Sequence, residues 1–213
     1  MALAENLDIA GRAVNAVRSL GYKSNNRGAL LDGLSPGTDA DGLGRFALQR
    51  QGDISRETLG IFFREFPKGE EPNGLQNLVA PAATGRQLRF GNCETRAALA
   101  LIYVATQSEI RPLELFSVGE DHVFMVIGRT AGLPREPAGW NDEAVICDPW
   151  AEQVYAKSQM MQKIRLPPVQ ACIGPDPKFS MCFEHREVAW PPAVLSSSLK
   201  KYALDRIWLP PSP

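Results

Sequence analysis

The chain has 213 residues, of which 44% are hydrophobic and 22% charged, and its formal net charge is −1 at pH 7. This length and composition fit one globular domain with a buried core. The near-zero charge argues against a nucleic-acid partner, because nucleic-acid-binding surfaces carry a marked basic excess. The N-terminus lacks a basic stretch followed by a continuous apolar one, and no apolar run approaches ~18 residues, so we expect a soluble protein with neither a signal peptide nor a membrane span.

The first part of the chain alternates between helix-like and loop-like segments. Apolar residues recur at helical spacing over residues 5–20, and Gly21 follows where a C-cap glycine commonly lies. A second helix is expected over residues 55–66, which place large apolar side chains on one broad face. Residues 24–53 and 67–85 are rich in Gly, Pro and polar residues and are predicted to be loops.

A buried helix is predicted to begin near Cys93. The residues that follow it, ETRAALALIYVAT, are apolar on nearly every side, which is typical of a helix enclosed by the core. A cysteine in the first turn of a helix faces unpaired N–H groups and the positive end of the helix dipole, and both favour a thiolate. The alternative is a small buried cysteine that packs the helix and has no chemical role.

The second half of the chain has the composition of a β-sheet. Four segments rich in Val, Ile and Phe are separated by Gly, Pro and Asn/Asp clusters: residues 113–118, 122–128, 143–149 and 153–156. A helix followed by consecutive strands, without alternation, predicts an α+β fold. We expect residues 1–213 to form a single domain, with a helical and loop part over residues 1–85 and a core over residues 86–213.

A histidine opens the second of these strand segments. The polar turn Gly-Glu-Asp precedes His122, and the apolar residues VFMVI follow it. A strand fixes the backbone of such a histidine while its side chain can reach a neighbouring helix end. A base for a thiol needs a pKa near neutrality, which histidine has. The other histidine, His185, lies among charged residues and is expected to be solvated, so His122 is the candidate base; a surface histidine at a loop edge is the alternative.

An aspartate ends the third strand segment. The residues AVIC precede Asp148, and Pro149 follows it. A carboxylate leaving a buried strand usually has a specific partner, because an unpaired buried charge is costly. If the two strands are neighbours, Asp148 orients the imidazole of His122 and stabilises its charged form. The alternative is a turn aspartate before proline. The connection over residues 129–143 is long for a hairpin, so it either faces a substrate or places Asp148 elsewhere.

Three segments together, GNCETRAALALIYV, GEDHVFMVIG and AVICDPW, resemble the papain-like and transglutaminase-like cysteine enzymes. Within that group they are most similar to bacterial effector and toxin domains that deamidate glutamine in host proteins. The resemblance implies a papain-like core, in which a central buried helix carrying Cys93 packs on an antiparallel sheet carrying His122 and Asp148. It covers about 60 residues, from Gly91 to Trp150. These residues lie in the expected catalytic core over residues 86–213, and in such proteins the part over residues 1–85 would shape the choice of substrate. The motifs define the catalytic class more closely than the reaction.

The resemblance implies a cysteine hydrolase that transfers acyl groups through a thioester on Cys93, without a metal or cofactor. Deamidation of glutamine in a protein substrate, such as a host protein, is ranked first; proteolysis and transglutamination are the alternatives, and acyl transfer to a small amine is a further one. A protein of this type would be delivered into a host cell by a specialised bacterial secretion system. A non-enzymatic interaction module with a silent triad belongs to a different functional class.

Two further residues are candidates for contacting the substrate or its oxyanion. Gln87 lies six positions before Cys93, as the oxyanion-hole glutamine does in papain-like proteases, and its amide would donate to developing negative charge. An exposed loop glutamine is the alternative for Gln87. Asn92, directly before the nucleophile, is the second candidate.

The four cysteines form no C-x-x-C pair, and the chain has only two histidines. A zinc site of ordinary ligand spacing is therefore hard to build, and no metal is expected. We expect the cysteines to be reduced, one of them reactive and the other three without a chemical role.

Overall fold

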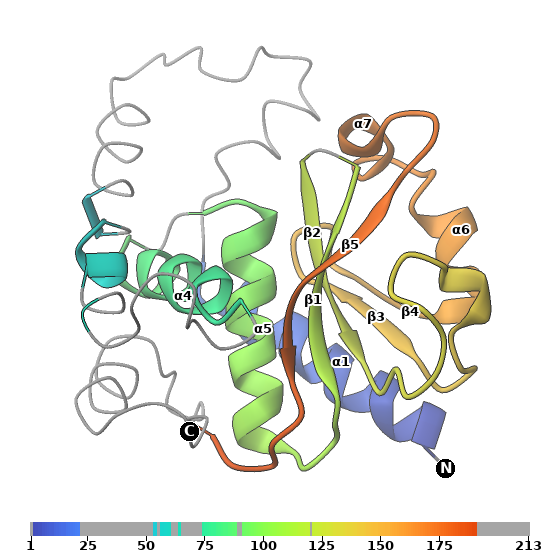
Figure 1. Cartoon of the computed structure of the whole chain (residues 1–213), viewed down its shortest axis with the longest axis horizontal. Coiled ribbons are helices and arrows are strands. Elements are labelled where there is room, and N and C mark those ends of the chain that lie inside the picture. The colour runs from blue at the N-terminus through green and yellow to red at the C-terminus, as the bar shows by residue number, and fades with distance from the viewer. Residues whose placement is uncertain are drawn as a thin grey trace.

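The computed structural model describes residues 2–21, 53–54, 56–60, 64, 74–88, 91–119 and 121–190. The strands in this part are β1 (Leu113–Val118), β2 (His122–Ile127), β3 (Val145–Asp148), β4 (Gln153–Ala156) and β5 (Phe179–His185). The α-helices are α1 (Ala2–Ser19), α4 (Gln76–Leu88), α5 (Cys93–Gln107), α6 (Met160–Lys163) and α7 (Gln170–Ile173), and the short 3-10 helices are η1 (Pro137–Gly139) and η2 (Lys157–Gln159). The strands form an antiparallel sheet in the order β4-β3-β2-β1-β5, with helices packed against it, which is the predicted α+β class (Figure 1).

The central helix is α5, and it is enclosed as its composition predicts. It begins at Cys93 and ends at Gln107. Its buried residues occupy all sides of the helix: Cys93, Thr95, Arg96, Ala97, Ala98, Leu99, Ala100, Leu101, Ile102, Val104 and Ala105. Helix α4 lies beside α5 on the side away from the sheet, and α1 and the sheet contact its other sides (Figure 1).

The two faces of the sheet bury different clusters, because successive side chains of a strand point to opposite faces. One face packs against α1 and α5, with a core that includes Leu113, Leu115, Met125, Ile127 and Cys147. The second face carries another cluster, which includes Phe124 and Ile146. His122 lies two residues before Phe124, and Asp148 lies two residues after Ile146. The alternation therefore places His122 and Asp148 together on the second face.

The first predicted helix is confirmed as α1. Gly21 has a φ of +65°, and its N–H donates to the carbonyl of Arg18 over 3.1 Å, so this glycine closes the helix in the left-handed conformation. In the second predicted helix, residues 56–60 and 64 are described and are helical. The predicted loop over residues 24–53 lies outside the described residues, apart from Asp53. None of the described helices is long and apolar enough to cross a membrane.

The loop predicted over residues 67–85 is wrong in its second part, because α4 occupies Gln76–Leu88. The buried apolar residues around and within this helix follow helical spacing: Leu75, Leu78, Val79, Ala82 and Ala83. Pro81, which the sequence analysis treated as a loop residue, lies inside the helix. It removes one N–H donor from the second turn, and burial of the apolar face against α5 outweighs that loss.

The long connection between β2 and β3 covers the second face of the sheet. It starts beyond Ile127, at the end of β2 opposite to His122. Trp140 anchors it in the cluster on this face, and the indole Nε1 donates to the carbonyl of Leu133 over 2.9 Å. Because β2 and β3 pair directly in antiparallel register, the length of the connection does not displace Asp148.

A buried ion pair fixes the start of this connection. Arg129 is 6% exposed and Glu114 0%. Nε of Arg129 donates to Oε2 of Glu114 over 2.8 Å, and Nη2 donates to Oε1 of the same carboxylate. Nη1 donates to the carbonyl of Gly132 over 2.6 Å, and the guanidinium lies 5.7 Å from the ring centroids of Phe116 and Trp140. The bidentate geometry ties the connection to β1.

Replacing Arg129 by Met should destabilise the fold by about 3–5 kcal/mol, because the Glu114 carboxylate would remain buried without its partner. Arg135→Met is the matched control, since the Arg135 side chain is 77% exposed and its ion pair with Glu136 spans 3.5 Å; its effect should stay within about 0.5 kcal/mol. Urea unfolding of both variants measures the difference. Equal free energies of unfolding would contradict the assigned role of the Arg129–Glu114 pair.

Candidate active site

Cys93 is the first residue of α5. Asn92 is the N-cap, and its Oδ1 accepts the N–H of Thr95 over 3.2 Å and the hydroxyl of Thr95 over 3.3 Å. Cys93 is 3% exposed, and its thiol donates to the carbonyl of Asp121 over 3.3 Å. The thiol therefore lies at the positive end of the helix dipole, against the turn that leads into His122.

The turn before His122 is held by α7 and the segment that follows it. Gly119 has a φ of +64°, and a Cβ at this position would lie 2.7 Å from the backbone of Ile173. The N–H of Gly119 donates to the carbonyl of Lys178 over 3.0 Å. Only glycine satisfies both the left-handed conformation and this close approach. The contact fixes the backbone from which Asp121 and His122 project.

The imidazole of His122 and the carboxylate of Asp148 form a buried pair. Nε2 of His122 lies 2.6 Å from Oδ2 of Asp148, and the two side chains are 0% and 1% exposed. Oδ1 of Asp148 accepts the N–H of Trp150 over 3.1 Å and that of Ala151 over 2.9 Å. The Trp150 ring lies beside the imidazole, with centroids 5.2 Å apart. Asp148 thus caps its own turn and orients the histidine at the same time.

The charges around His122 favour its protonated form. Burial lowers the pKa of His122, but the Asp148 carboxylate and its hydrogen bond oppose this effect and, with a smaller contribution from Cys93, raise the pKa to about 10. Nδ1 of His122 is buried and has no hydrogen-bond partner in the described part of the chain. Because Asp148 occupies Nε2, Nδ1 is the nitrogen on which a proton from Cys93 would lie in the imidazolium form.

The structure therefore brings Cys93, His122 and Asp148 to one end of the sheet. Gln87 lies in the last turns of α4, and its side chain is exposed. The side chain of Asn92 serves the N-terminus of α5. An oxyanion or substrate role for Gln87 and Asn92 stays a prediction.

The solvated environment predicted for His185 is wrong. This residue ends β5 and is 3% exposed, with its ring 5.6 Å from that of Trp190 in a T-shaped contact. Burial and the neighbouring Arg111 lower the pKa of His185 to about 4, and Glu187 opposes them. The charged neighbours Glu184 and Arg186 suggested that His185 is exposed to solvent. Neighbouring side chains along a strand point to opposite faces, so these two residues do not share the environment of His185.

A second thiol near the site was missed in the sequence. Cys172, in α7, packs half-buried against the same apolar cluster that contains Cys93. Burial raises the pKa of Cys172 to about 11, and the negative charges of Cys93, Asp121 and Asp148 add to this rise. No local sequence motif predicts that Cys172 lies near the site, because its location depends on the contact between α7 and the Gly119 turn. All four cysteines are unpaired, and among the described residues no cluster of His, Cys, Asp or Glu is placed to hold a metal.

No family model matches the chain, and no match was found among curated proteins or solved structures.

The free energy of unfolding should depend on pH through the His122–Asp148 pair. The folded chain holds the His122 proton with a pKa of about 10, against 6.5 for the free side chain. The pair therefore stabilises the fold fully below about pH 6.5, and this contribution declines as the pH rises towards 10. Urea unfolding between about pH 6 and pH 10 should show this decline in the wild type and a weaker one in Asp148→Asn. The same slope in both proteins would contradict the raised pKa.

Substitutions of Asn92 separate its capping role from contact with a substrate. Asn92→Ala should destabilise the fold by about 1 kcal/mol, whereas Asn92→Ser keeps a side-chain acceptor and should have little effect. Thermal or urea unfolding measures both values. If the Asn92 amide also donates to an oxyanion, Asn92→Ser would lose turnover while keeping its stability; unchanged turnover would exclude that role.

Proposed function

We propose that this chain is a cysteine-dependent acyl-transfer enzyme with a papain-like core. The observation that supports the proposal most strongly is the buried hydrogen bond between His122 and Asp148, next to a cysteine at a helix N-terminus. In this proposal Cys93 is the nucleophile, His122 carries protons and Asp148 orients the imidazole.

The proposed reaction starts from an ion pair, in which the proton of Cys93 already lies on Nδ1 of His122 and the thiolate faces the imidazolium. The thiolate then attacks the carbonyl carbon of a carboxamide, and the C=O electron pair moves onto oxygen. In this proposal, N–H groups in the first turn of α5 donate to this developing charge. His122 returns the proton to the leaving nitrogen, ammonia departs and a thioester remains on Cys93. Water, deprotonated by His122, attacks the thioester, and the C–S bond breaks. The products are a carboxylic acid and the Cys93 thiolate beside the protonated His122, which restores the starting pair.

The preferred reaction is deamidation of glutamine in a protein substrate. In this proposal the chain is an effector- or toxin-type enzyme that acts on a host protein. The resemblance of the three sequence segments supports this class. The burial of the site adds a physical argument, because Cys93 is 3% exposed and His122 0%. A glutamine carboxamide at the end of a flexible side chain needs a narrower opening than a peptide bond flanked by main chain on both sides. Papain-like proteolysis and transglutamination use the same triad and are the alternatives.

An interaction module with a silent triad is the non-enzymatic alternative. Burying a histidine against a carboxylate carries a desolvation cost, and apolar residues of similar volume commonly replace such pairs without loss of stability. A module without catalysis would therefore gain little from keeping His122, Asp148 and a helix-terminal cysteine together.

Mass spectrometry of candidate protein substrates tests the proposal. Incubation with the wild type should add about 1 Da at a glutamine, because the thioester route replaces NH₂ by OH. Cys93→Ala should lower this rate by about 10³-fold or more. Cys182→Ala is the matched control, since Cys182 lies on β5 away from the site, and it should keep full activity.

The products also discriminate between the alternatives. Cleaved chains that depend on Cys93 would replace deamidation by proteolysis, and cross-linked chains would replace it by transglutamination. Full activity of Cys93→Ala in any of these reactions would overturn the assignment of the nucleophile.

A further inference from the structure

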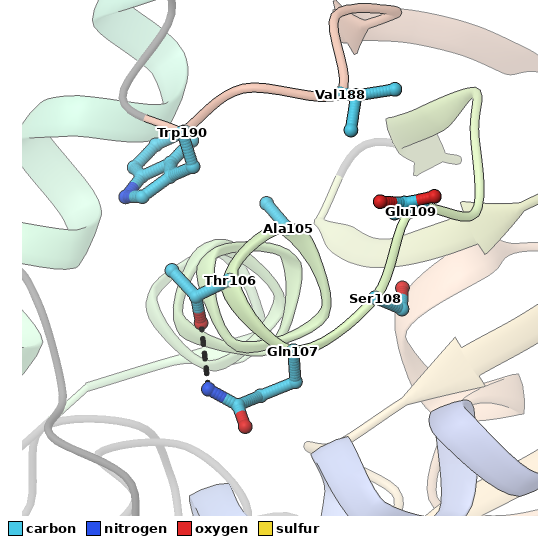
Figure 2. A pocket seen from close by; sticks show the side chains of 7 residues that line it. All are labelled: Ala105, Thr106, Gln107, Ser108, Glu109, Val188 and Trp190. Atoms are coloured by element: carbon cyan, nitrogen blue, oxygen red, sulfur yellow. Dashed lines mark hydrogen bonds between the residues drawn. The ribbon is translucent and has the colours of Figure 1, made fainter.

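A hollow lies at the C-terminal end of α5, the end opposite to Cys93 (Figure 2). Its volume is about 500 Å³, within the range of ~300–1,000 Å³ typical of small-ligand sites. The last turn of α5 forms the floor, and Glu109, Val188 and Trp190 contribute the walls. Because α5 has 15 residues, this hollow is separated from Cys93 by about 20 Å along the helix.

The floor of the hollow presents backbone carbonyls. Helix carbonyls point towards the C-terminal end, which carries about half a negative charge. The carbonyl of Val104 accepts the N–H and the hydroxyl of Ser108, each over 3.0 Å. The carbonyls of Thr106 and Gln107 receive no hydrogen bond from the described residues. Within the described part of the chain, these two acceptors have no donor where the helix meets the hollow.

The walls combine a carboxylate with an aromatic ring. Figure 2 shows Trp190 on one side of the hollow and Glu109 on the other, with Ala105 between them. Glu109 is exposed and forms no ion pair with the described residues. An indole ring attracts cations through its π face. Ala105 and Val188 offer apolar surface to an alkyl stem between these polar groups.

Arg111 is the nearby cation, and its guanidinium is already hydrogen-bonded to backbone carbonyls. Its guanidinium donates to the carbonyls of Ala105, Ser108, Ile110, Glu187 and Val188. It joins the end of α5 to the segment beyond β5, and it is not among the residues that line the hollow. Burial lowers the pKa of Arg111, and the Glu109 carboxylate opposes this shift. Among the described residues, Arg111 forms no ion pair with Glu109 and leaves the carbonyls of Thr106 and Gln107 without a donor.

We propose that this hollow binds the lysine side chain of a polypeptide partner, with its ammonium group between Glu109 and the end of α5 and its alkyl stem against Trp190 and Val188. The carboxylate and the carbonyls accept the ammonium N–H groups, and the ring adds a cation–π contact. This binding does not require catalysis at Cys93, so it can be tested independently of the proposed function.

Titration of the isotope-labelled protein with N-acetyl-lysine amide tests the site by NMR. At low salt the Trp190 indole N–H and the Ser108 amide should shift saturably. N-acetyl-norleucine amide, which has a similar chain without the ammonium group, should produce no saturable shift at the same concentrations. Glu109→Gln should weaken binding about two- to fivefold, the size expected for one exposed ion pair.

Glu136→Gln is the matched control, because Glu136 is an exposed carboxylate at the start of η1; its affinity should equal that of the wild type. The alkylation rate of Cys93 should be the same in Glu109→Gln and the wild type, which shows that the fold and the other end of α5 are intact. Equal shifts with the norleucine compound, no saturable shift with the lysine compound, or equal weakening in Glu109→Gln and Glu136→Gln would each overturn the proposal.

Discussion

The hydrogen bond between Nε2 of His122 and Oδ2 of Asp148 is the constraint on which the rest of the site depends. It spans 2.6 Å between side chains that are almost completely buried, so neither group could stay charged without the other. The antiparallel pairing of β2 with β3 brings the two residues together. The N–H groups of Trp150 and Ala151 then hold the second carboxylate oxygen. Because Nε2 is hydrogen-bonded to Asp148, the orientation of the imidazole is set, and Nδ1 is the nitrogen that can interact with Cys93.

Helix α5 connects the two ends of the molecule where ligands are proposed to bind. Its N-terminus offers N–H groups and a positive dipole to a thiolate and an oxyanion. Its C-terminus offers carbonyls, which Arg111 satisfies in part. One buried helix thus gives the two sites opposite polarity. An anionic intermediate suits the Cys93 end and a cationic side chain suits the Glu109 end.

The parts of the site that the sequence could predict are those with local signals. An apolar run on all sides of a helix marked the start of α5 at Cys93, and the polar-to-apolar transitions marked the start of β2 and the end of β3. Local patterns failed where tertiary contacts decide. Burial against α5 keeps α4 helical through Pro81. Pairing with β1 turns His185 into the interior, and the packing of α7 places Cys172 near the site.

The rate of Cys93 alkylation by iodoacetamide between about pH 5 and pH 9, resolved by peptide mass spectrometry, tests the central claim most directly. An ordinary thiol, with a pKa of about 8.5, loses about tenfold in rate for each pH unit below that value. The account predicts that Cys93 keeps reacting at about pH 6 in the wild type, because His122 holds the proton as an imidazolium, and that His122→Gln restores the ordinary pH profile. The same steep profile in the wild type and in His122→Gln would contradict it.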